Sequence, residues 1–184
     1  MVLTKTPICN FGEKPHSFEL KDVSEKVCNF RDLTGEKGTL IMFICNHCPY
    51  VKAVIKDIVN DANNLKNLNV NTIAIMSNDT KNYPDDSFEN MIKFSKINKF
   101  NFPYLLDETQ ETAKKYGAVC TPDFFGYNRD LELQYRGRIR ELKNLKPVST
   151  GKSDLFNAMK MIAETGKGPQ NQIPSMGCNI KWFK

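Results

Sequence analysis

A Cys-x-x-Cys-Pro motif stands between a buried strand and a long amphipathic helix, and this junction constrains the fold more than any other feature. Residues 39–44 are apolar after the first position, which is typical of a central strand buried on both faces. Residues 49–67 carry apolar side chains at spacings of three and four, which predicts a helix. Pro49 suits its first turn, because the missing N–H would have no partner there. The segment Cys45-Asn46-His47-Cys48-Pro49 is therefore predicted to form a strand-to-helix turn.

Strand and helix patterns alternate along the rest of the chain. The pattern predicts strands at residues 16–20, 27–30, 70–76, 102–106, 123–127 and 132–137, and helices at 88–98, 109–116 and 153–162. Ser87 and Ser153 are the predicted N-caps and Gly117 the predicted helix stop. Alternation of this kind calls for an α/β fold with a central mixed sheet, helices on both faces and an N-terminal β extension. We predict one domain over residues 1–184, with its core at about 15–165 and an irregular tail at 166–184.

Composition excludes several classes of partner. The net charge of +5 comes from 26 basic and 21 acidic residues that are mostly interspersed, and no nucleic-acid-binding motif is present, so we expect no nucleic-acid partner. No apolar stretch approaches the ~18 residues of a membrane span, and no signal peptide is evident, so we expect no membrane association and a cytoplasmic location. Six cysteines in a chain of this kind favour redox or metal-binding roles over a disulfide scaffold.

The spacing of Cys45 and Cys48 suits redox chemistry. Residues three apart in a first helical turn share a face, and a slight tightening brings their sulfurs to disulfide distance. The partial positive charge of a helix N-terminus favours the nucleophilic thiolate, and a protonated His47 would favour it further. We predict that Cys45 and Cys48 are the catalytic pair and form a reversible disulfide. The alternative is a metal site built from Cys45, Cys48 and His47, but these residues supply only three of the four ligands of a closed zinc site. No metal and no cofactor is predicted.

The sequence resembles the thioredoxin-like group of the AhpC/TSA (peroxiredoxin-like) superfamily, over nearly the whole chain. The blocks that carry the resemblance are C-N-H-C-P-Y-V-K-A (45–53), S-N-D-T-K-N-Y-P-D-D-S (77–87), F-P-Y-L-L-D-E-T-Q-E (102–111) with C-T-P-D-F-F (120–125), and Y-R-G-R-I (135–139) with G-C-N-I-K-W (177–182). The resemblance implies a thioredoxin-like fold in which a cis Pro122 faces the cysteine pair and the Thr121 backbone binds an extended substrate. It also implies that Arg138 stabilises a thiolate or binds an anionic group.

Four further residues are candidates for supporting roles. The strand before Cys45 lacks the buried carboxylate of thioredoxins, and Asp79 and Asp123, with His47, are the possible substitutes. Cys120 precedes Thr121 and is expected near the reactive pair, either as a third redox thiol or as a core residue. Cys178 lies in the tail, in a block that carries the resemblance, and is a candidate for an additional redox thiol.

Cys45 and Cys48 could each be the attacking thiol, and the choice between them bears on the reaction. By analogy with thioredoxins Cys45 is the more exposed attacker and Cys48 resolves, whereas by analogy with peroxiredoxins Cys48 attacks; access for a bulky substrate favours Cys45. Peroxiredoxins read P-x-x-x-T-x-x-C-P, but here Ile41 takes the Pro place and Cys45 the Thr place. We therefore predict a thiol–disulfide oxidoreductase that acts on a protein or small-molecule disulfide and is reset by a thiol reductant. A thiol-dependent peroxidase is the alternative, and a metallochaperone module is the third reading.

Overall fold

The computed structural model describes residues 2–184, and a seven-stranded mixed sheet forms its centre. In spatial order the strands are β3 (Val27–Asn29), β2 (Glu19–Asp22), β6 (Tyr104–Leu106), β5 (Val70–Met76), β4 (Gly38–Phe43), β8 (Asp123–Asn128) and β9 (Leu133–Tyr135). Strands β4, β5 and β6 run parallel, and the outer pairs are antiparallel. The carboxyl ends of the three parallel strands therefore meet at one edge of the sheet.

Helices cover both faces of this sheet, as the alternating pattern predicts. They are α1 (Phe30–Leu33), α2 (Pro49–Lys66), the 3₁₀ helix η1 (Pro84–Asp86), α3 (Phe88–Ile97), α4 (Glu111–Tyr116) and α5 (Asp154–Thr165). Successive side chains of β4 enter two separate cores, because neighbouring residues of a strand point to opposite faces. Leu40 and Met42 pack with α2 and α5, whereas Ile41 and Phe43 pack with α1 and α4.

Three predicted helix boundaries agree with the structure. The hydroxyl of Ser153 accepts a hydrogen bond from Phe156 N at 2.8 Å, and that of Ser87 accepts one from Asn90 N at 3.3 Å. Helix α4 ends at Gly117, whose φ of 60° is the left-handed conformation that favours glycine. At the N-terminal side the predicted strand at 16–20 is displaced to β2, and α1 follows β3 without a predicted pattern, because a single turn is too short to show one.

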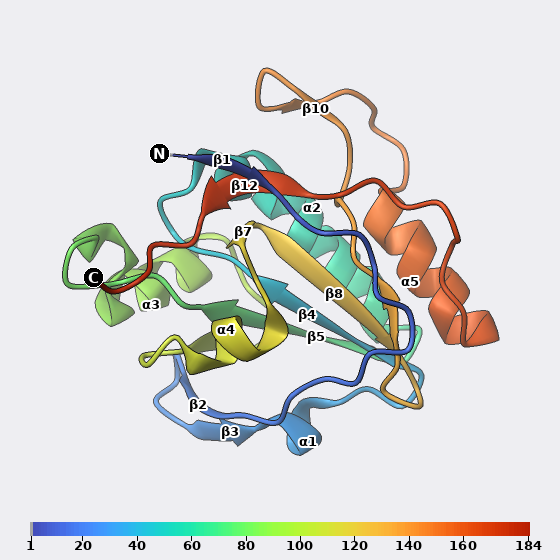
Figure 1. The fold of residues 1–184 in the computed structure, drawn as a ribbon, viewed down its shortest axis with the longest axis horizontal. Helices are drawn as coiled ribbons and strands as arrows, with labels where there is room; N and C mark the ends of the chain where they lie inside the picture. The colour runs from blue at the N-terminus through green and yellow to red at the C-terminus, as the bar shows by residue number, and fades with distance from the viewer. Residues whose placement is uncertain (1) are drawn as a thin grey trace.

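The predicted irregular tail contains one regular element, which the sequence analysis did not predict. Residues of the tail form β12 (Met176–Asn179), which lies between β1 (Leu3–Lys5) and β7 (Cys120–Thr121) in a second, three-stranded sheet (Figure 1). In Figure 1 the red strand β12 and the blue strand β1 run side by side, so the two ends of the chain close over the core together. Gly177 permits this close packing, because a Cβ atom there would lie 2.0 Å from the carbonyl oxygen of Thr121.

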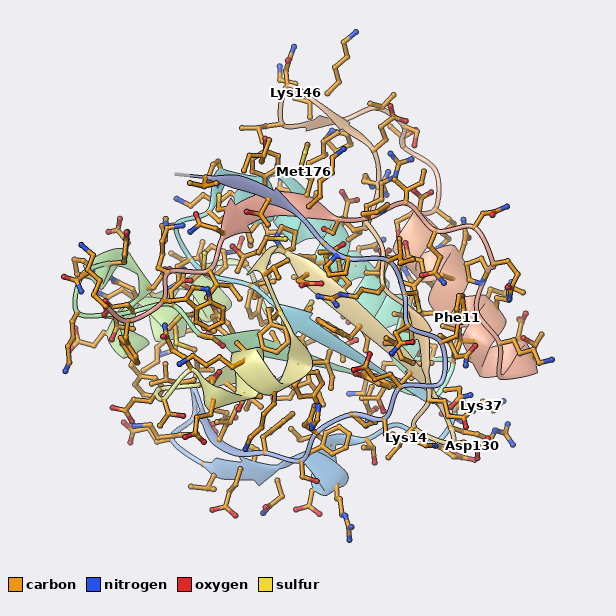
Figure 2. The ribbon with its side chains drawn as sticks, viewed as in Figure 1. Phe11, Lys14, Lys37, Asp130, Lys146 and Met176 are labelled. Carbon is orange, nitrogen blue, oxygen red and sulfur yellow. The ribbon has the colours of Figure 1, made fainter. Side chains whose placement is uncertain are left out.

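Two peripheral features complete the fold. Strands β10 (Leu142–Lys143) and β11 (Lys146–Pro147) form a small hairpin that projects from the body of the molecule, as the position of Lys146 shows in Figure 2. Lys14 holds the N-terminal segment to the β8–β9 turn by donating to the carbonyl oxygen of Asp130 at 2.8 Å (Figure 2). Among residues 2–184 no helix is both long and apolar enough to cross a bilayer.

Candidate active site

The Cys-x-x-Cys motif lies where the sequence predicts it, between the carboxyl end of β4 and the start of α2. Cys48 is the N-cap residue of α2, with extended backbone angles, and Pro49 occupies the first turn. The first backbone bond of the helix runs from Lys52 N to Cys48 O, at 3.0 Å. The amide groups of the first turn are therefore available to other acceptors, as at every helix start.

Thr121 contacts both cysteines of the motif. Its hydroxyl oxygen lies 3.4 Å from the sulfur of Cys45, and its carbonyl oxygen lies 3.1 Å from the sulfur of Cys48, whose thiol form donates to it. The peptide bond between Thr121 and Pro122 is cis, as the resemblance implies. Thr121 therefore faces the sulfur pair from the opposite side of the turn.

A third sulfur joins this pair. The Sγ atoms of Cys48 and Cys178 lie 2.7 Å apart. Cys178 sits in β12 directly opposite Thr121 of β7, so the pairing of the two strands brings its side chain to the site. Cys178 is thus at the reactive pair, although 130 residues separate it from Cys48 in the sequence.

The prediction that Cys45 is the more exposed thiol is wrong. Cys45 and Cys48 are both fully buried, with 0% of their surface exposed, and Cys178 is 1% exposed. Strand β12 adds a layer on the Thr121 side of the motif, and the segment around Asp86 binds its other side. Because the two sulfurs are equally buried, solvent exposure does not favour Cys45 over Cys48 as the attacking thiol.

The surroundings of the two motif cysteines differ in charge. A hydrogen bond from Cys45 lowers the pKa of Cys48 to about 5, and further hydrogen bonds from Cys178, the Val51 N–H and Thr121 outweigh the opposing effect of burial. The pKa of Cys45 is raised well above its ordinary value, by its hydrogen bond to Cys48, by burial and by the nearby carboxylate of Asp86. The structure therefore favours Cys48 as the thiolate and Cys45 as the neutral thiol beside it.

Asp86 organises the loop between the cysteines, and the sequence reasoning missed it. Its Oδ1 atom accepts from the backbone N–H of Asn46 at 2.8 Å and of His47 at 3.3 Å, and its Oδ2 atom lies 2.6 Å from Nδ1 of His47. The hydrogen bond to Asp86 raises the pKa of His47, which favours the imidazolium next to the Cys48 thiolate. The His47 ring stacks on Tyr83 with an interplanar angle of 7°.

The two predicted aspartates bind groups other than the cysteines of the motif. Asp79 accepts from Asn82 and from the backbone N–H of Lys81, so its carboxylate stabilises its own turn. Asp123 is fully buried and forms an ion pair with Arg136 at 3.0 Å, so its charge is already matched. The carboxylate that binds the cysteine turn is instead that of Asp86. Asp86 belongs to the same block at residues 77–87 and stands seven positions after Asp79.

Arg138 does not reach the sulfurs. Its Nε atom donates to Asp154 at 2.7 Å, and its guanidinium also lies 3.8 Å from Glu141. The side chain lines a pocket of ≈ 300 Å³ together with Pro122 and Tyr50, next to the cysteine turn. The expectation that Arg138 stabilises the thiolate is therefore wrong, although a role toward a bound group in this pocket stays a prediction.

Cys120 lies in the core beside the site. It is 0% exposed, and its thiol lies 3.6 Å from the carbonyl oxygen of Pro122, to which it donates. Burial raises the pKa of this thiol far above its ordinary value. Of the two readings of Cys120, these surroundings favour the inert core residue.

The residues that could hold a metal are Cys45, His47 and Asp86, whose ligand atoms lie within 4.8 Å of one another. Both carboxylate oxygens of Asp86 already accept hydrogen bonds, including one of 2.8 Å from Asn78. A closed zinc site would need a fourth ligand and a free carboxylate oxygen. The arrangement therefore fits a hydrogen-bonded network better than it fits a metal site.

Comparison with known proteins agrees with this geometry. The sequence profile of the AhpC/TSA family matches residues 11–142. An uncharacterized conserved protein from Geobacillus kaustophilus is 39% identical, with a TM-score of 0.94 over 100% of this chain and 97% of the other. A hypothetical protein from Sinorhizobium meliloti is 31% identical, with a TM-score of 0.90 over 98% of each chain.

A more distant structure shows the fold alone. A secreted disulfide oxidoreductase from Mycobacterium tuberculosis is 20% identical, with a TM-score of 0.54 over 64% of this chain and 80% of the other. The likeness supports the thioredoxin-like α/β fold that the sequence predicts. No curated protein matches the sequence.

Proposed function

The chain belongs to the AhpC/TSA family, a family of thiol-based oxidoreductases and peroxidases, and from that membership we propose that it is a thiol–disulfide oxidoreductase with Cys48 as the nucleophile. The observation that carries the proposal is the placement of two thiols at the start of α2, where Cys48 is the N-cap residue and Thr121 contacts the sulfurs of both Cys45 and Cys48. The lowered pKa of Cys48 and the raised pKa of Cys45 agree with Cys48 as the nucleophile. A nucleophile and a second thiol in contact are the two parts that disulfide exchange requires.

The reaction proceeds in two exchanges. The Cys48 thiolate attacks one sulfur of a substrate disulfide, a mixed disulfide forms, and the other substrate sulfur leaves as a thiolate. The Cys45 thiol then gives its proton to the first substrate thiolate and attacks the Cys48 sulfur, so that the Cys45–Cys48 bond forms and the second substrate thiolate leaves. The substrate disulfide gains two electrons and the protein dithiol loses them. A thiol reductant restores the dithiol by the reverse exchanges.

Complete burial of the sulfurs bears on the substrate. A folded protein could not bring a disulfide to Cys48 without displacing the segments that cover it, whereas a small-molecule disulfide needs only a local opening. The pocket beside Pro122 and Tyr50 adjoins the site and is large enough for part of such a molecule. We therefore propose a small-molecule disulfide as the substrate class.

Peroxide reduction is the second candidate, and the same burial favours it. After a local opening, a small hydroperoxide could oxidise the Cys48 thiolate of low pKa to a sulfenic acid, which a neighbouring thiol would then resolve. Against it, the three arginines between β9 and β10 bind carboxylates rather than a sulfur: Arg136 binds Asp123, Arg138 binds Asp154 and Arg140 binds Asp57. None of these three arginines is therefore free to polarise the O–O bond of a peroxide at Cys48.

The deciding measurement compares second-order rate constants of the reduced protein with dithiodipyridine, hydrogen peroxide and an organic hydroperoxide. We expect dithiodipyridine to react fastest. The Cys48→Ser variant should react at least about a hundredfold more slowly than the parent protein. The Cys120→Ser variant, which replaces another buried thiol, is the matched control and should react at the parent rate. Should either peroxide react faster by about two orders of magnitude, or roughly 2.7 kcal/mol in barrier, the peroxidase would replace this proposal.

A further inference from the structure

Cys48 has two sulfur neighbours and can bond to only one of them at a time. Cys45 lies within hydrogen-bond reach of Cys48, and Cys178 lies at an Sγ–Sγ distance of 2.7 Å from it. To form a disulfide bond of about 2.05 Å, the sulfurs of Cys48 and Cys178 would have to approach each other by only about 0.7 Å. The tail therefore supplies a sulfur at bonding reach of the nucleophile.

We propose that Cys178 is a third redox-active thiol, so that Cys48 is the shared centre of a three-sulfur relay in which the bonds Cys48–Cys178 and Cys45–Cys48 interchange. The inference rests on the proposed function, because it takes Cys48 as the attacking thiol. It adds a second resolving group and ties the redox state of the site to strand β12.

Contacts on both sides of Cys178 hold its sulfur in place. On the N-terminal side, Ser175 exchanges hydrogen bonds with Thr6, at 2.9 and 3.0 Å, and its hydroxyl donates to the carbonyl oxygen of Pro122 at 2.8 Å. On the C-terminal side, the carbonyl oxygen of Lys181 accepts from Asp79 N and from the Gln110 side chain, each at 2.8 Å. The entropy of ordering this segment is lost when the protein folds, so the attack by Cys178 incurs no such cost.

Backbone N–H groups at the start of helix α2 form hydrogen bonds with both sulfurs of the proposed bond. The backbone N–H of Val51 stabilises the Cys48 thiolate, and the backbone N–H of Tyr50 does the same for Cys178. These are consecutive amides of the first turn, where no helical acceptor exists for them. Cys178 thus lies at the same helix start as the nucleophile, beside the neighbouring amide.

The charge on Cys48 controls the reactivity of Cys178. Burial raises the pKa of Cys178 to about 12, and the hydrogen bond and negative charge of Cys48 contribute to the increase. Once Cys48 is part of a mixed disulfide it is neutral, and both contributions from Cys48 vanish. The pKa of Cys178 then falls, so the thiol becomes a better nucleophile at the step where one is needed.

The relay step balances without another reactant. After the Cys48 thiolate has attacked a disulfide, the Cys178 thiol gives its proton to the first substrate thiolate and attacks the Cys48 sulfur, the Cys48–Cys178 bond forms, and the second substrate thiolate leaves. Two protein thiols have then supplied two electrons to one disulfide. The Cys45 thiol then attacks the Cys48 sulfur, the Cys48–Cys178 bond breaks, and the released Cys178 sulfur takes up the proton that Cys45 loses, so the Cys45–Cys48 bond forms with no net electron transfer.

The test uses the full chain with Cys9 and Cys28, the two partly exposed cysteines, replaced by Ser. Dithiodipyridine is added in slight excess to the reduced protein, the released pyridinethione is counted, and peptide mapping locates the bridges. In the Cys45→Ser variant we expect two equivalents per chain and a Cys48–Cys178 bridge, formed within about tenfold of the parent rate. In Cys178→Ser we expect a Cys45–Cys48 bridge alone. Cys120→Ser, which removes another buried thiol next to β12, should form both bridges.

The outcomes separate this inference from the proposed function. If Cys45→Ser stops at one equivalent, with a stable pyridyl adduct on Cys48, the relay is overturned while Cys48 remains the nucleophile. If the parent protein itself gives no reaction at Cys48, both proposals fail. Where Cys178→Ser proves unstable, limiting oxidant on the parent protein replaces it, and a complete lack of Cys48–Cys178 peptide there also overturns the relay.

Discussion

The carboxylate of Asp86 lies 2.6 Å from Nδ1 of His47, which stands between Asn46 and Cys48 in the Cys-x-x-Cys turn. Asp86 is fully buried, whereas 17% of the His47 side chain is exposed. The same carboxylate accepts two backbone N–H groups of the turn, so it fixes the turn and also places a negative charge near Cys45. One residue of η1 therefore helps to keep Cys45 protonated and His47 charged.

Replacing Asp86 by Asn is expected to destabilise the fold and to lower the pKa of His47. The amide keeps one acceptor for the backbone but sets an NH₂ group against the Asn78 side chain, which donates to Asp86 in the parent protein at 2.8 Å. A buried hydrogen-bonding group left without a partner costs about 1–3 kcal/mol. Urea unfolding measures the stability, and NMR titration of the imidazole follows the pKa.

Asp85→Asn is the matched control, because Asp85 is exposed and adjacent in sequence. It should leave the stability and the His47 titration within error of the parent protein. An unchanged His47 pKa in Asp86→Asn would contradict the assignment of Asp86 as the group that holds the imidazolium.

The ionisation of Cys48 sets the pH range of activity. Because its hydrogen bond from Cys45, followed by those from Cys178 and Val51, lowers the pKa of Cys48 to about 5, the thiolate persists above that pH and is lost as the pH falls through it. Ultraviolet thiolate absorbance should therefore titrate near pH 5, far below the ordinary 9.0 of a thiol. The transition should disappear in Cys48→Ser.

Substitution of Cys45 distinguishes the main cause of that shift. Cys45→Ala removes the donor and should raise the pKa of Cys48, whereas Cys45→Ser keeps a hydroxyl donor and should raise it less. Equal titrations in the two variants would mean that the Cys45 hydrogen bond is not the principal cause.

A buried carboxyl far from the sulfurs should also make stability depend on pH. Asp61 of α2 is 2% exposed and accepts a hydrogen bond from Ser153, the N-cap of α5. Burial raises its pKa to about 6 from the ordinary 3.8, so the folded protein binds a proton there that the unfolded chain has released. The contribution of Asp61 to stability therefore falls as the pH rises from about 4 to about 6.

Asp61→Asn removes this dependence, because the amide does not ionise. Relative to the parent protein, the free energy of unfolding of the variant should improve by up to about 3 kcal/mol between pH 4 and pH 7, from a shift of roughly two pKa units. Urea unfolding at both pH values measures the difference, with Asp85→Asn as the control. A variant that loses the same stability at both values would show that Asp61 does not titrate in this range.

Local patterns were enough to predict the scaffold of the site. The apolar run that becomes β4 and the one-faced pattern of α2 are visible without the structure, and they place the Cys45–Cys48 turn correctly. The cis bond before Pro122 followed from the resemblance and from no local pattern. Strand β4, helix α2 and the turn between them could be predicted because periodicity and the Cys-x-x-Cys motif involve residues that are close in the sequence.

The features that set the chemistry depend on long-range packing. Strand β12 has four residues and includes Gly177, so neither alternation nor propensity reveals it; its register against β7 is what brings Cys178 to Cys48. Likewise, Asp79 and Asp86 stand in one polar segment, and only the path of the loop decides which carboxylate points toward the turn. The burial of Cys45 has the same origin, because the segments that cover it are distant in the sequence.

The hydroxyl of Thr121 should tune the site without controlling its architecture. It lies 3.4 Å from the Cys45 sulfur and stabilises the ionised Cys48, whereas the pairing of β7 with β12 uses the Thr121 backbone. Thr121→Val removes the hydroxyl and keeps the branched shape, so the pKa of Cys48 should rise while the strand pairing remains. Below the new pKa the variant then holds less thiolate than the parent protein, and above it both are ionised.

The rate constant with dithiodipyridine should therefore fall several-fold in Thr121→Val at about pH 5 and return toward the parent value at about pH 8, since a higher pKa reduces the thiolate fraction only at the lower pH. Thr121→Ser keeps the hydroxyl and should follow the parent protein at both. An equal loss at the two pH values would instead indicate a displaced Cys48, because a change in geometry, unlike a change in ionisation, does not depend on pH.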